Sequence, residues 1–192
     1  IGELCQKRQV SVIIATPTFL QHYMRRLTPE HFASLDTVVV GAERLPEALR
    51  EAFLEKFGID PLQGFGTTEC SPVVSVNVND FRSPGLHQIG HKHGSIGHPL
   101  PGIAARIVHA ETGQQLAPGQ EGLLELKGPN IMQGYLAMPE KTAEVLHDGW
   151  YNTGDMALID EDGFVFITGR PARFGKIGGE MVPHVAVEEK IR

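Results

Sequence analysis

Val10-Ser11-Val12-Ile13-Ile14-Ala15 is the stretch that decides the fold of the first part of this chain. Four of its six residues are β-branched or aliphatic in the way that a buried strand prefers, which predicts a short strand here. The threonines that follow, Thr16 and Thr18, are good helix N-caps. A helix is predicted next, from Phe19 to Leu27, because its apolar residues recur at helical spacing.

The same alternation continues further along the chain. Thr37 to Val40 predicts a second buried strand. The stretch between Pro46 and Gly58 predicts an amphipathic helix with a proline near its start and a glycine at its end. Leu62 to Phe65 predicts a third short strand. Strands that alternate with helices at this spacing indicate a parallel α/β subdomain, which we assign to residues 1–93.

The pattern changes from Gly94 onward. Turn residues recur at short intervals, and short alternating segments lie between them, which is typical of a small antiparallel sheet or barrel. One helix is predicted inside this part, from Pro139 to Leu146. We assign residues 94–168 to a small β-barrel subdomain. Its predicted strands are residues 104–108, 122–127 and 164–167.

Composition excludes several classes of protein. The 192 residues carry a net charge of -6, which argues against a nucleic-acid-binding surface, because such a surface needs basic residues to displace phosphate counterions. No apolar run approaches the roughly 20 residues of a transmembrane helix. The two cysteines, Cys5 and Cys70, supply neither a disulfide framework nor a four-thiolate zinc site. A cytoplasmic location is therefore expected.

Gly64-Phe65-Gly66-Thr67-Thr68-Glu69 follows the third predicted strand and is the first candidate for chemistry. Its glycines allow the backbone to approach a ligand, and its hydroxyls can donate to phosphate oxygens. Glu69 offers the oxygen ligand that Mg²⁺ prefers, and Phe65 offers an aromatic face for a base. The alternative is a glycine-rich turn in which Thr68 caps a helix.

The second candidate is Trp150-Tyr151-Asn152-Thr153-Gly154-Asp155. A carboxylate beside a glycine can approach a diol and accept hydrogen bonds from both hydroxyls. Arg170 follows the predicted strand near residue 168 and places a guanidinium at its end. The alternatives are that Asp155 is a solvated turn residue and that Arg170 is a surface charge.

The order of these motifs resembles that of the adenylate-forming superfamily, which includes acyl-CoA synthetases, luciferases and the adenylation domains of peptide synthetases. The resemblance covers residues 41–192 and is carried by the Gly64–Glu69 motif, Glu121 to Gly128 with Gly134-Tyr135-Leu136, the motif ending at Asp155, and Gly169-Arg170. It implies the α/β fold of the large domain of these enzymes, in which a parallel α/β subdomain is followed by a small β-barrel. Residues 169–192 would then form the hinge and the start of the C-terminal domain.

The resemblance also implies roles for single residues. Thr68 and Glu69 would be the catalytic residues, with Thr68 on the α-phosphate and Glu69 on Mg²⁺. Phe65 would stack on adenine, Asp155 would hold the ribose hydroxyls, and Arg170 would support the nucleotide. Gly41, Ala42 and Glu43 would line the adenine pocket, and Gly64 would be a further nucleotide-binding residue.

The implied activity is that of an ATP-dependent ligase that activates a fatty acid as an acyl-adenylate and passes it to a phosphopantetheine thiol. The run from Arg173 to Val182 resembles the acyl–acyl-carrier-protein synthetase branch, which is often fused to an acyltransferase of phospholipid metabolism. Acyl carrier protein is therefore the expected acceptor, with coenzyme A as the alternative. Lys176 either serves the thiol-transfer step or is a solvated hinge residue.

The chain itself is expected to be an internal fragment. The phosphate-binding loop of the family would lie before Ile1 and the C-terminal catalytic lysine after Arg192, so the isolated chain is expected to be inactive. Any contact with the inner membrane would belong to the missing portions. A rival hypothesis is a binding module for a nucleotide or a carrier protein, without chemistry of its own.

A metal site is the other rival. His87, His91, His93 and His98 lie within a short segment, and imidazoles are common zinc ligands. The segment from Ser83 to Pro99 is predicted to be a loop, which does not by itself bring two histidines onto one face. A solvated loop is the alternative.

Overall fold

The computed structural model describes residues 1–170, 174–177 and 180–183, with side chains up to Arg170. The chain divides into two compact units. Unit 1 consists of Ile1–Thr68 and Pro72–Leu100, and unit 2 consists of Glu69–Ser71 and the residues from Pro101 onward. The subdomain boundaries at residues 93 and 168 remain predictions.

Unit 1 is built on a five-stranded sheet in the order β1-β2-β3-β4-β7. The first three strands are parallel, as the sequence predicts: β1 (Val12–Ala15), β2 (Thr37–Val40) and β3 (Leu62–Gly66). Two short strands not predicted from sequence, β4 (Val73–Val76) and β7 (His98–Pro99), extend the sheet in antiparallel fashion. The sheet is therefore mixed.

The helices of unit 1 begin and end where the local sequence requires. Thr16 caps α2 (Pro17–Arg26) by accepting a hydrogen bond from the Phe19 amide at 3.4 Å. Gly58 ends α3 with a left-handed φ of 72°, which glycine adopts without strain. Helix α3 spans Glu47–Phe57. The remaining helices of this unit are α1 (Gly2–Arg8) and the short 3-10 helix η1 (Pro29–Phe32).

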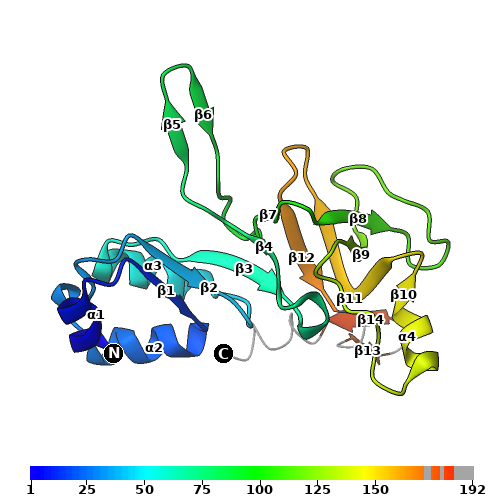
Figure 1. The fold of residues 1–192 in the computed structure, drawn as a ribbon, viewed down its shortest axis with the longest axis horizontal. Coiled ribbons are helices and arrows are strands. Elements are labelled where there is room, and N and C mark those ends of the chain that lie inside the picture. Colours follow the sequence, from blue (N-terminus) through cyan, green and yellow to red (C-terminus); the bar gives the residue numbers. More distant parts are fainter. Residues whose placement is uncertain (171–173, 178–179, 184–192) are drawn as a thin grey trace. The chain divides into compact units, whose positions relative to one another are not determined.

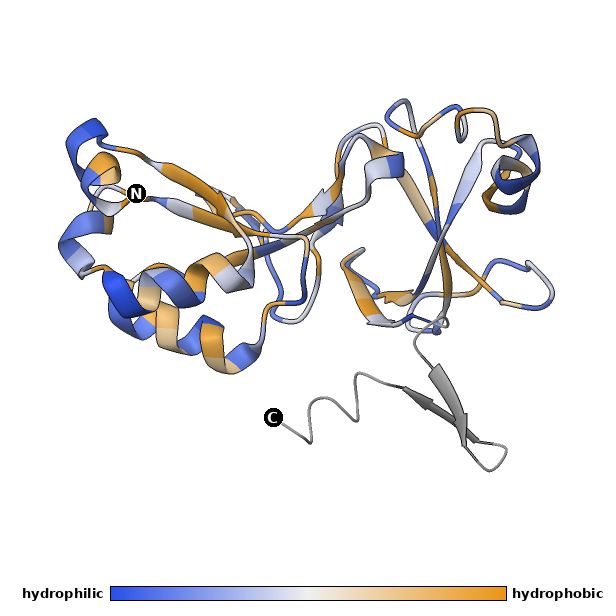
Figure 2. Cartoon of the chain, turned by 90° about the horizontal axis from the view of Figure 1, so that it is seen from below, coloured by the Kyte–Doolittle hydropathy of each residue, from blue (hydrophilic) through white to orange (hydrophobic). Residues whose placement is uncertain are grey.

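The core of unit 1 lies between the sheet and these helices. Val38 and Val40 of β2 are fully buried, as are Phe32 and Phe53, whose ring centroids lie 6.3 Å apart. The alternation of buried residues along β2 shows that one face of the strand packs on the helices. Ile14 of β1, in contrast, is 80% exposed. Figure 2 shows the apolar character of these strands in orange.

A hairpin of two short strands, β5 (Phe81–Ser83) and β6 (Leu86–Gln88), extends from unit 1 as the green arm of Figure 1. The prediction that Ser83 to Pro99 is a loop is wrong for β6 and β7. Gly85, with a φ of +78°, supplies the left-handed residue that a tight hairpin turn requires. Three-residue strands with exposed side chains carry too little apolar alternation to be detected in sequence.

Unit 2 is an antiparallel sheet in the order β10-β11-β9-β8. Strand β12 pairs with the second half of β11, from Met156 to Ile159. The sheet curls into a half-barrel, so the predicted antiparallel subdomain is confirmed. Leu124 and Leu126, which lie in strand β9 of this sheet, are fully buried. The bounds are β8 (Ala104–Val108), β9 (Gly122–Lys127), α4 (Pro139–Val145), β10 (Leu146–His147), β11 (Trp150–Ile159) and β12 (Val165–Gly169).

Beyond β12, a two-stranded ribbon pairs β13 (Phe174–Ile177) with β14 (Glu180–Pro183). The predicted hinge falls partly on residues 171–173 and 178–179, which lie outside the described residues, as do residues 184–192. In the part of the chain that the structure describes, no helix has the length and apolar character needed to cross a membrane.

Candidate functional site

In unit 1 the predicted site residues gather at the carboxyl ends of two parallel strands. Gly41 directly follows β2, and Gly64 lies in the adjacent strand β3. A Cβ atom placed on Gly41 would lie 3.7 Å from the carbonyl oxygen of Gly64, so the two backbones are in van der Waals range. In open α/β sheets this edge is where ligands bind. The structure thus brings together two segments that the sequence places separately.

Ala42 and Glu43 continue from Gly41 along the surface of this edge. Ala42 has a left-handed φ of 68°, which is uncommon for a residue other than glycine and marks a sharp change of chain direction. The Glu43 carboxylate accepts a hydrogen bond from the Thr18 hydroxyl at 3.3 Å. Both residues are exposed and accessible to a ligand.

Gly66 has a structural role in addition to the one expected. A Cβ atom at this position would lie 2.0 Å from the carbonyl oxygen of Pro72, so no other residue fits without moving the backbone. The pairing of β3 with β4 is irregular between Phe65 and Gly66. Phe65 itself is half-buried and lies opposite Ser75. The glycine is therefore required for packing as well as available for a ligand.

Two hydroxyls at this end of β3 have no hydrogen-bond partner in the described part of the chain. The Thr67 hydroxyl oxygen and that of Ser75, a fully buried residue, are both inaccessible. Buried polar groups normally have partners, so a buried water molecule is the expected partner of each of these two. Thr68, which we predicted to bind the α-phosphate, begins the 3-10 turn η2 (Thr68–Cys70) and is exposed.

In unit 2 the carboxylate of Glu69 is held from a distant part of the sequence. The hydroxyl of Tyr135 donates a hydrogen bond to Oε1 of Glu69 at 2.9 Å. The Glu69 carbonyl accepts from the Met132 amide at 2.7 Å, and the next carbonyl, that of Cys70, accepts from the Asn130 side chain at 2.7 Å. Side chain and backbone of Glu69 are thus positioned by one segment.

Burial raises the pKa of Tyr135 above its ordinary value, and the hydrogen bond to Glu69 and the charge of that carboxylate raise it further. The phenol is therefore a stable donor at neutral pH. Sequence reasoning assigned no role to Tyr135. Its only sequence signal was its place in the Gly134-Tyr135-Leu136 motif.

Asp155 and Arg170 form an ion pair, with Nε of Arg170 2.9 Å from Oδ1 of Asp155. The aspartate side chain is 8% exposed and the arginine side chain 48% exposed. Asp155 lies in β11 and Arg170 directly follows the neighbouring antiparallel strand β12, since Met156 of β11 pairs with Gly169 of β12. The alternative that Asp155 is a solvated turn residue is wrong, because the residue is buried in β11.

Asp155 lies in an irregular part of β11. The pairing of β11 with β9 shifts between Asn152 and Met156, and Gly154 has a left-handed φ of 71°. The Thr153 hydroxyl bridges this segment, since it donates to the Leu124 carbonyl and accepts from the Asp155 amide, each at 3.1 Å. Bulges of this kind redirect a side chain out of the regular pleat.

Glu69 supplies a carboxylate of the kind that Mg²⁺ binds, since Mg²⁺ takes one or two carboxylates together with substrate phosphates. Its Oε1 accepts the hydrogen bond from Tyr135. Lys176, for which the sequence left two roles open, lies in β13. The structure does not describe its side chain.

The chain is similar in sequence to a known family of enzymes. The model of the family described as AMP-binding enzyme matches residues 1–136. A long-chain-fatty-acid–CoA ligase of Salmonella typhimurium is 40% identical over 139 residues, which cover 72% of this chain and 23% of that protein. A long-chain-fatty-acid–CoA ligase of Bacillus subtilis is 32% identical over 191 residues, which cover 98% of this chain and 33% of that protein.

Among solved structures, ATP-bound MatB from Rhodopseudomonas palustris has a TM-score of 0.83 and 31% sequence identity, and the match covers 100% of this chain and 37% of that one. The chain therefore spans only 23–37% of the length of these relatives. These matches indicate the same family as the order of the sequence motifs and the mixed and antiparallel sheets of the structure. The chain belongs to the AMP-binding enzyme family, the adenylate-forming enzymes.

Proposed function

We propose that the protein to which this chain belongs is an ATP-dependent ligase that joins a fatty acid to a phosphopantetheine thiol. The observation that carries the proposal is the Glu69 carboxylate, held by Tyr135 directly after the Gly64–Thr68 segment. A single positioned carboxylate next to backbone and hydroxyl donors is suited to binding a nucleotide triphosphate with its metal ion. The names of the fatty-acid ligase relatives support the acid substrate.

The reaction has two steps. In the first, an oxygen of the fatty-acid carboxylate bonds to the α-phosphorus of ATP, the bond to the bridging oxygen breaks, and pyrophosphate leaves. In the second, the thiol sulfur bonds to the acyl carbon, the bond to the AMP oxygen breaks, and AMP and a proton are released. Activation is required because a carboxylate is itself a poor electrophile.

The residues of this chain bind and position the reactants in that scheme. Phe65 stacks on adenine, Thr68 donates to the α-phosphate, and Asp155 accepts from the ribose hydroxyls. Arg170 holds the Asp155 carboxylate and supports the nucleotide. Glu69 would hold Mg²⁺, which would neutralise charge on the phosphates. Positioning of this kind accounts for a large part of the rate acceleration of many enzymes.

Different observations support the two candidate thiol acceptors, coenzyme A and acyl carrier protein. Coenzyme A is supported by the names of the relatives. Acyl carrier protein is supported by the Arg173–Val182 sequence, part of which lies outside the described residues. We favour coenzyme A, because the Bacillus subtilis ligase matches 98% of the chain whereas the other argument rests on one short run.

The experiment is a pyrophosphate-release assay on the complete protein with a series of fatty acids. Activity that requires ATP, Mg²⁺ and a fatty acid supports ligation, and the acceptor is then identified by thioester formation with coenzyme A or with acyl carrier protein. Absence of fatty-acid-dependent pyrophosphate release contradicts the proposal. Thioester formation with acyl carrier protein alone contradicts our choice of acceptor.

A binding measurement on the 192-residue chain accompanies this assay. We expect AMP and ATP to bind with dissociation constants of about 1 mM, because a ligand that keeps only part of its contacts still loses its translational and rotational freedom. Ligand-observed NMR measures this directly. Micromolar binding of ATP, or turnover by the chain alone, would contradict the placement of the site.

A further inference from the structure

A second cluster of ligating side chains lies in unit 1, away from the residues discussed so far. Asp60, His91 and His93 each offer one ligand atom, and these three atoms lie within 4.8 Å of one another. Asp60 precedes β3, whereas the two histidines lie between β6 and β7. The chain therefore brings together an aspartate and two histidines that follow it by 31 and 33 positions of sequence.

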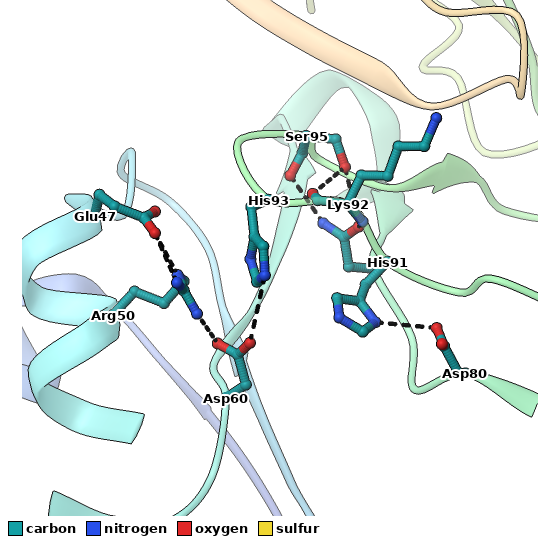
Figure 3. Close-up of polar contacts among 9 residues, drawn as sticks. Glu47, Arg50, Asp60, Asp80, His91, Lys92, His93 and Ser95 are labelled. Carbon is teal, nitrogen blue, oxygen red and sulfur yellow. Dashed lines mark hydrogen bonds and ion pairs between the residues drawn. The ribbon is translucent and has the colours of Figure 1, made fainter. Parts of the chain in front are cut away.

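The side chains of the cluster are oriented by neighbours that leave a ligand atom free. Oδ1 of Asp60 accepts a hydrogen bond from Nη1 of Arg50 at 2.8 Å, whereas Oδ2 lies 3.9 Å from Nε2 of His93. Arg50 is in turn held by Glu47 at 2.7 Å. This places one oxygen of Asp60 toward His93, as Figure 3 shows.

His91 also has a carboxylate neighbour. Its Nδ1 lies 3.2 Å from Oδ1 of Asp80, and in Figure 3 the ring lies between Asp80 on one side and His93 with Asp60 on the other. A carboxylate beside one ring nitrogen is a usual neighbour of metal-bound histidines, although in the described part of the chain this contact does not have the geometry of a hydrogen bond. The two histidine ring centroids are 5.7 Å apart.

The loop that carries the histidines is held rigidly. Asn77, which is 3% exposed, donates to the Ser95 carbonyl at 2.8 Å and accepts from the Lys92 amide at 3.1 Å and the Ser95 hydroxyl at 3.0 Å. Gly90, directly before His91, has no room for a Cβ, which would lie 2.6 Å from two carbonyl oxygens. The ligands are thus preorganised rather than carried on a freely moving loop.

We propose that Asp60, His91 and His93 bind one divalent transition-metal ion of the zinc type. Two imidazoles and one carboxylate form a donor set that Zn²⁺ accepts, with metal–ligand distances of about 2.0–2.2 Å, and a water molecule completes the tetrahedron. Some of the distances between the three ligand atoms need to shorten by up to about 1.5 Å to reach the separations of a tetrahedral site. Lys92, between the histidines, extends its ammonium group away from Asp60 in Figure 3 and leaves the site to the cation.

The bound ion would fasten two connections of unit 1 to each other. One is the connection from α3 to β3, which carries Asp60, and the other is the base of the β5–β6 hairpin, which carries the histidines. The site is separate from the residues proposed for nucleotide binding, so the two proposals stand or fall independently. Its role is structural, and its effect is on stability rather than on turnover.

The test is a titration of the untagged 192-residue chain with Zn²⁺ by calorimetry, and with Co²⁺ by visible absorption. We expect one ion per chain with a dissociation constant of about 10 μM or below, and a rise in Tm of about 5 °C at a hundredfold excess over that constant. Mg²⁺ at the same concentration should not compete, because it prefers oxygen ligands.

Substitutions identify the ligands. His91→Gln, His93→Gln and Asp60→Asn should each weaken Zn²⁺ binding at least about 30-fold, and Asp80→Asn, which removes only an orienting carboxylate, about 10-fold. The matched control is His87→Gln. His87 lies 3.4 Å from the same Asp80 carboxylate but outside the cluster, so its replacement should change the affinity by less than about threefold.

Three results would overturn the proposal. They are an absence of saturable Zn²⁺ binding below about 1 mM, unchanged binding in His91→Gln and His93→Gln, and an equal loss in His87→Gln. Circular dichroism checks that each variant is folded. If His91→Gln unfolds, His93→Gln decides, because the His93 side chain is 54% exposed and contributes little to the core.

Discussion

The hydroxyl of Tyr135 donates a hydrogen bond to Oε1 of Glu69 at 2.9 Å, across 66 positions of sequence. The bond joins Glu69, the last residue of the Gly64–Glu69 motif, to the Gly134-Tyr135-Leu136 motif. Both Glu69 and Tyr135 belong to unit 2. One oxygen of the carboxylate that we propose as the magnesium ligand is thereby fixed. This relationship gives the proposed magnesium ligand a defined orientation and generates the first two predictions.

Glu69→Gln should reduce the activity of the complete protein, and added Mg²⁺ should partly restore it, because the amide binds the ion less tightly than the carboxylate. Steady-state rates measured over a range of Mg²⁺ concentrations check this. Glu140→Gln, at an exposed position of α4, is the control and should behave as wild type. If Glu69 only stabilises a turn, added Mg²⁺ will make no difference and Tm will fall.

The raised pKa of Tyr135 predicts how stability responds to alkaline pH. Below pH 10, the ordinary value for tyrosine, the phenol is neutral in both folded and unfolded chains. Above it, the unfolded chain loses the proton first, so the free energy of unfolding falls as pH rises toward the folded-state pKa. Comparison of denaturant unfolding in wild type and Tyr135→Phe between neutral and alkaline pH measures this. An identical pH dependence in the two proteins would show that Tyr135 titrates normally.

Asp155→Asn should raise the KM for ATP of the complete protein. A carboxylate accepts from two ribose hydroxyls, whereas an amide offers one acceptor oxygen, so a loss of about 1.5–3 kcal/mol is expected. Asp148→Asn is the control, since Asp148 is exposed in a turn of the same unit with a left-handed φ of 50° that asparagine tolerates. Unchanged ATP kinetics in Asp155→Asn would remove this residue from the nucleotide site.

Gly66→Ala should destabilise unit 1 by about 3 kcal/mol, because the added Cβ would lie 2.0 Å from the Pro72 carbonyl oxygen and the backbone has to move. Gly41→Ala provides the comparison. Its Cβ would meet only the Gly64 carbonyl oxygen, at an ordinary 3.7 Å, so the stability should change little. Urea unfolding of both variants checks the pair, and equal stabilities would contradict the steric argument.

Much of the framework could be predicted from sequence because its signals are local. The β-branched runs of β1 and β2 mark buried strands, and Thr16 and Gly58 mark helix ends through the hydrogen bonds and backbone angles that they permit. The β5–β6 hairpin was missed. Its three-residue strands are exposed on both faces, so no pattern of burial is present in its sequence.

The sequence by itself determined the alternation of strands and helices, the antiparallel second part and the candidate residues Glu69, Asp155 and Arg170, because each depends on neighbours in the chain or on a motif. Only the tertiary structure decided that Tyr135 orients Glu69 and that His91 and His93 meet Asp60. Such contacts join residues that are distant along the chain, and they form only after strand pairing and core burial have fixed the loops. No local pattern of residues shows which distant residues will come into contact.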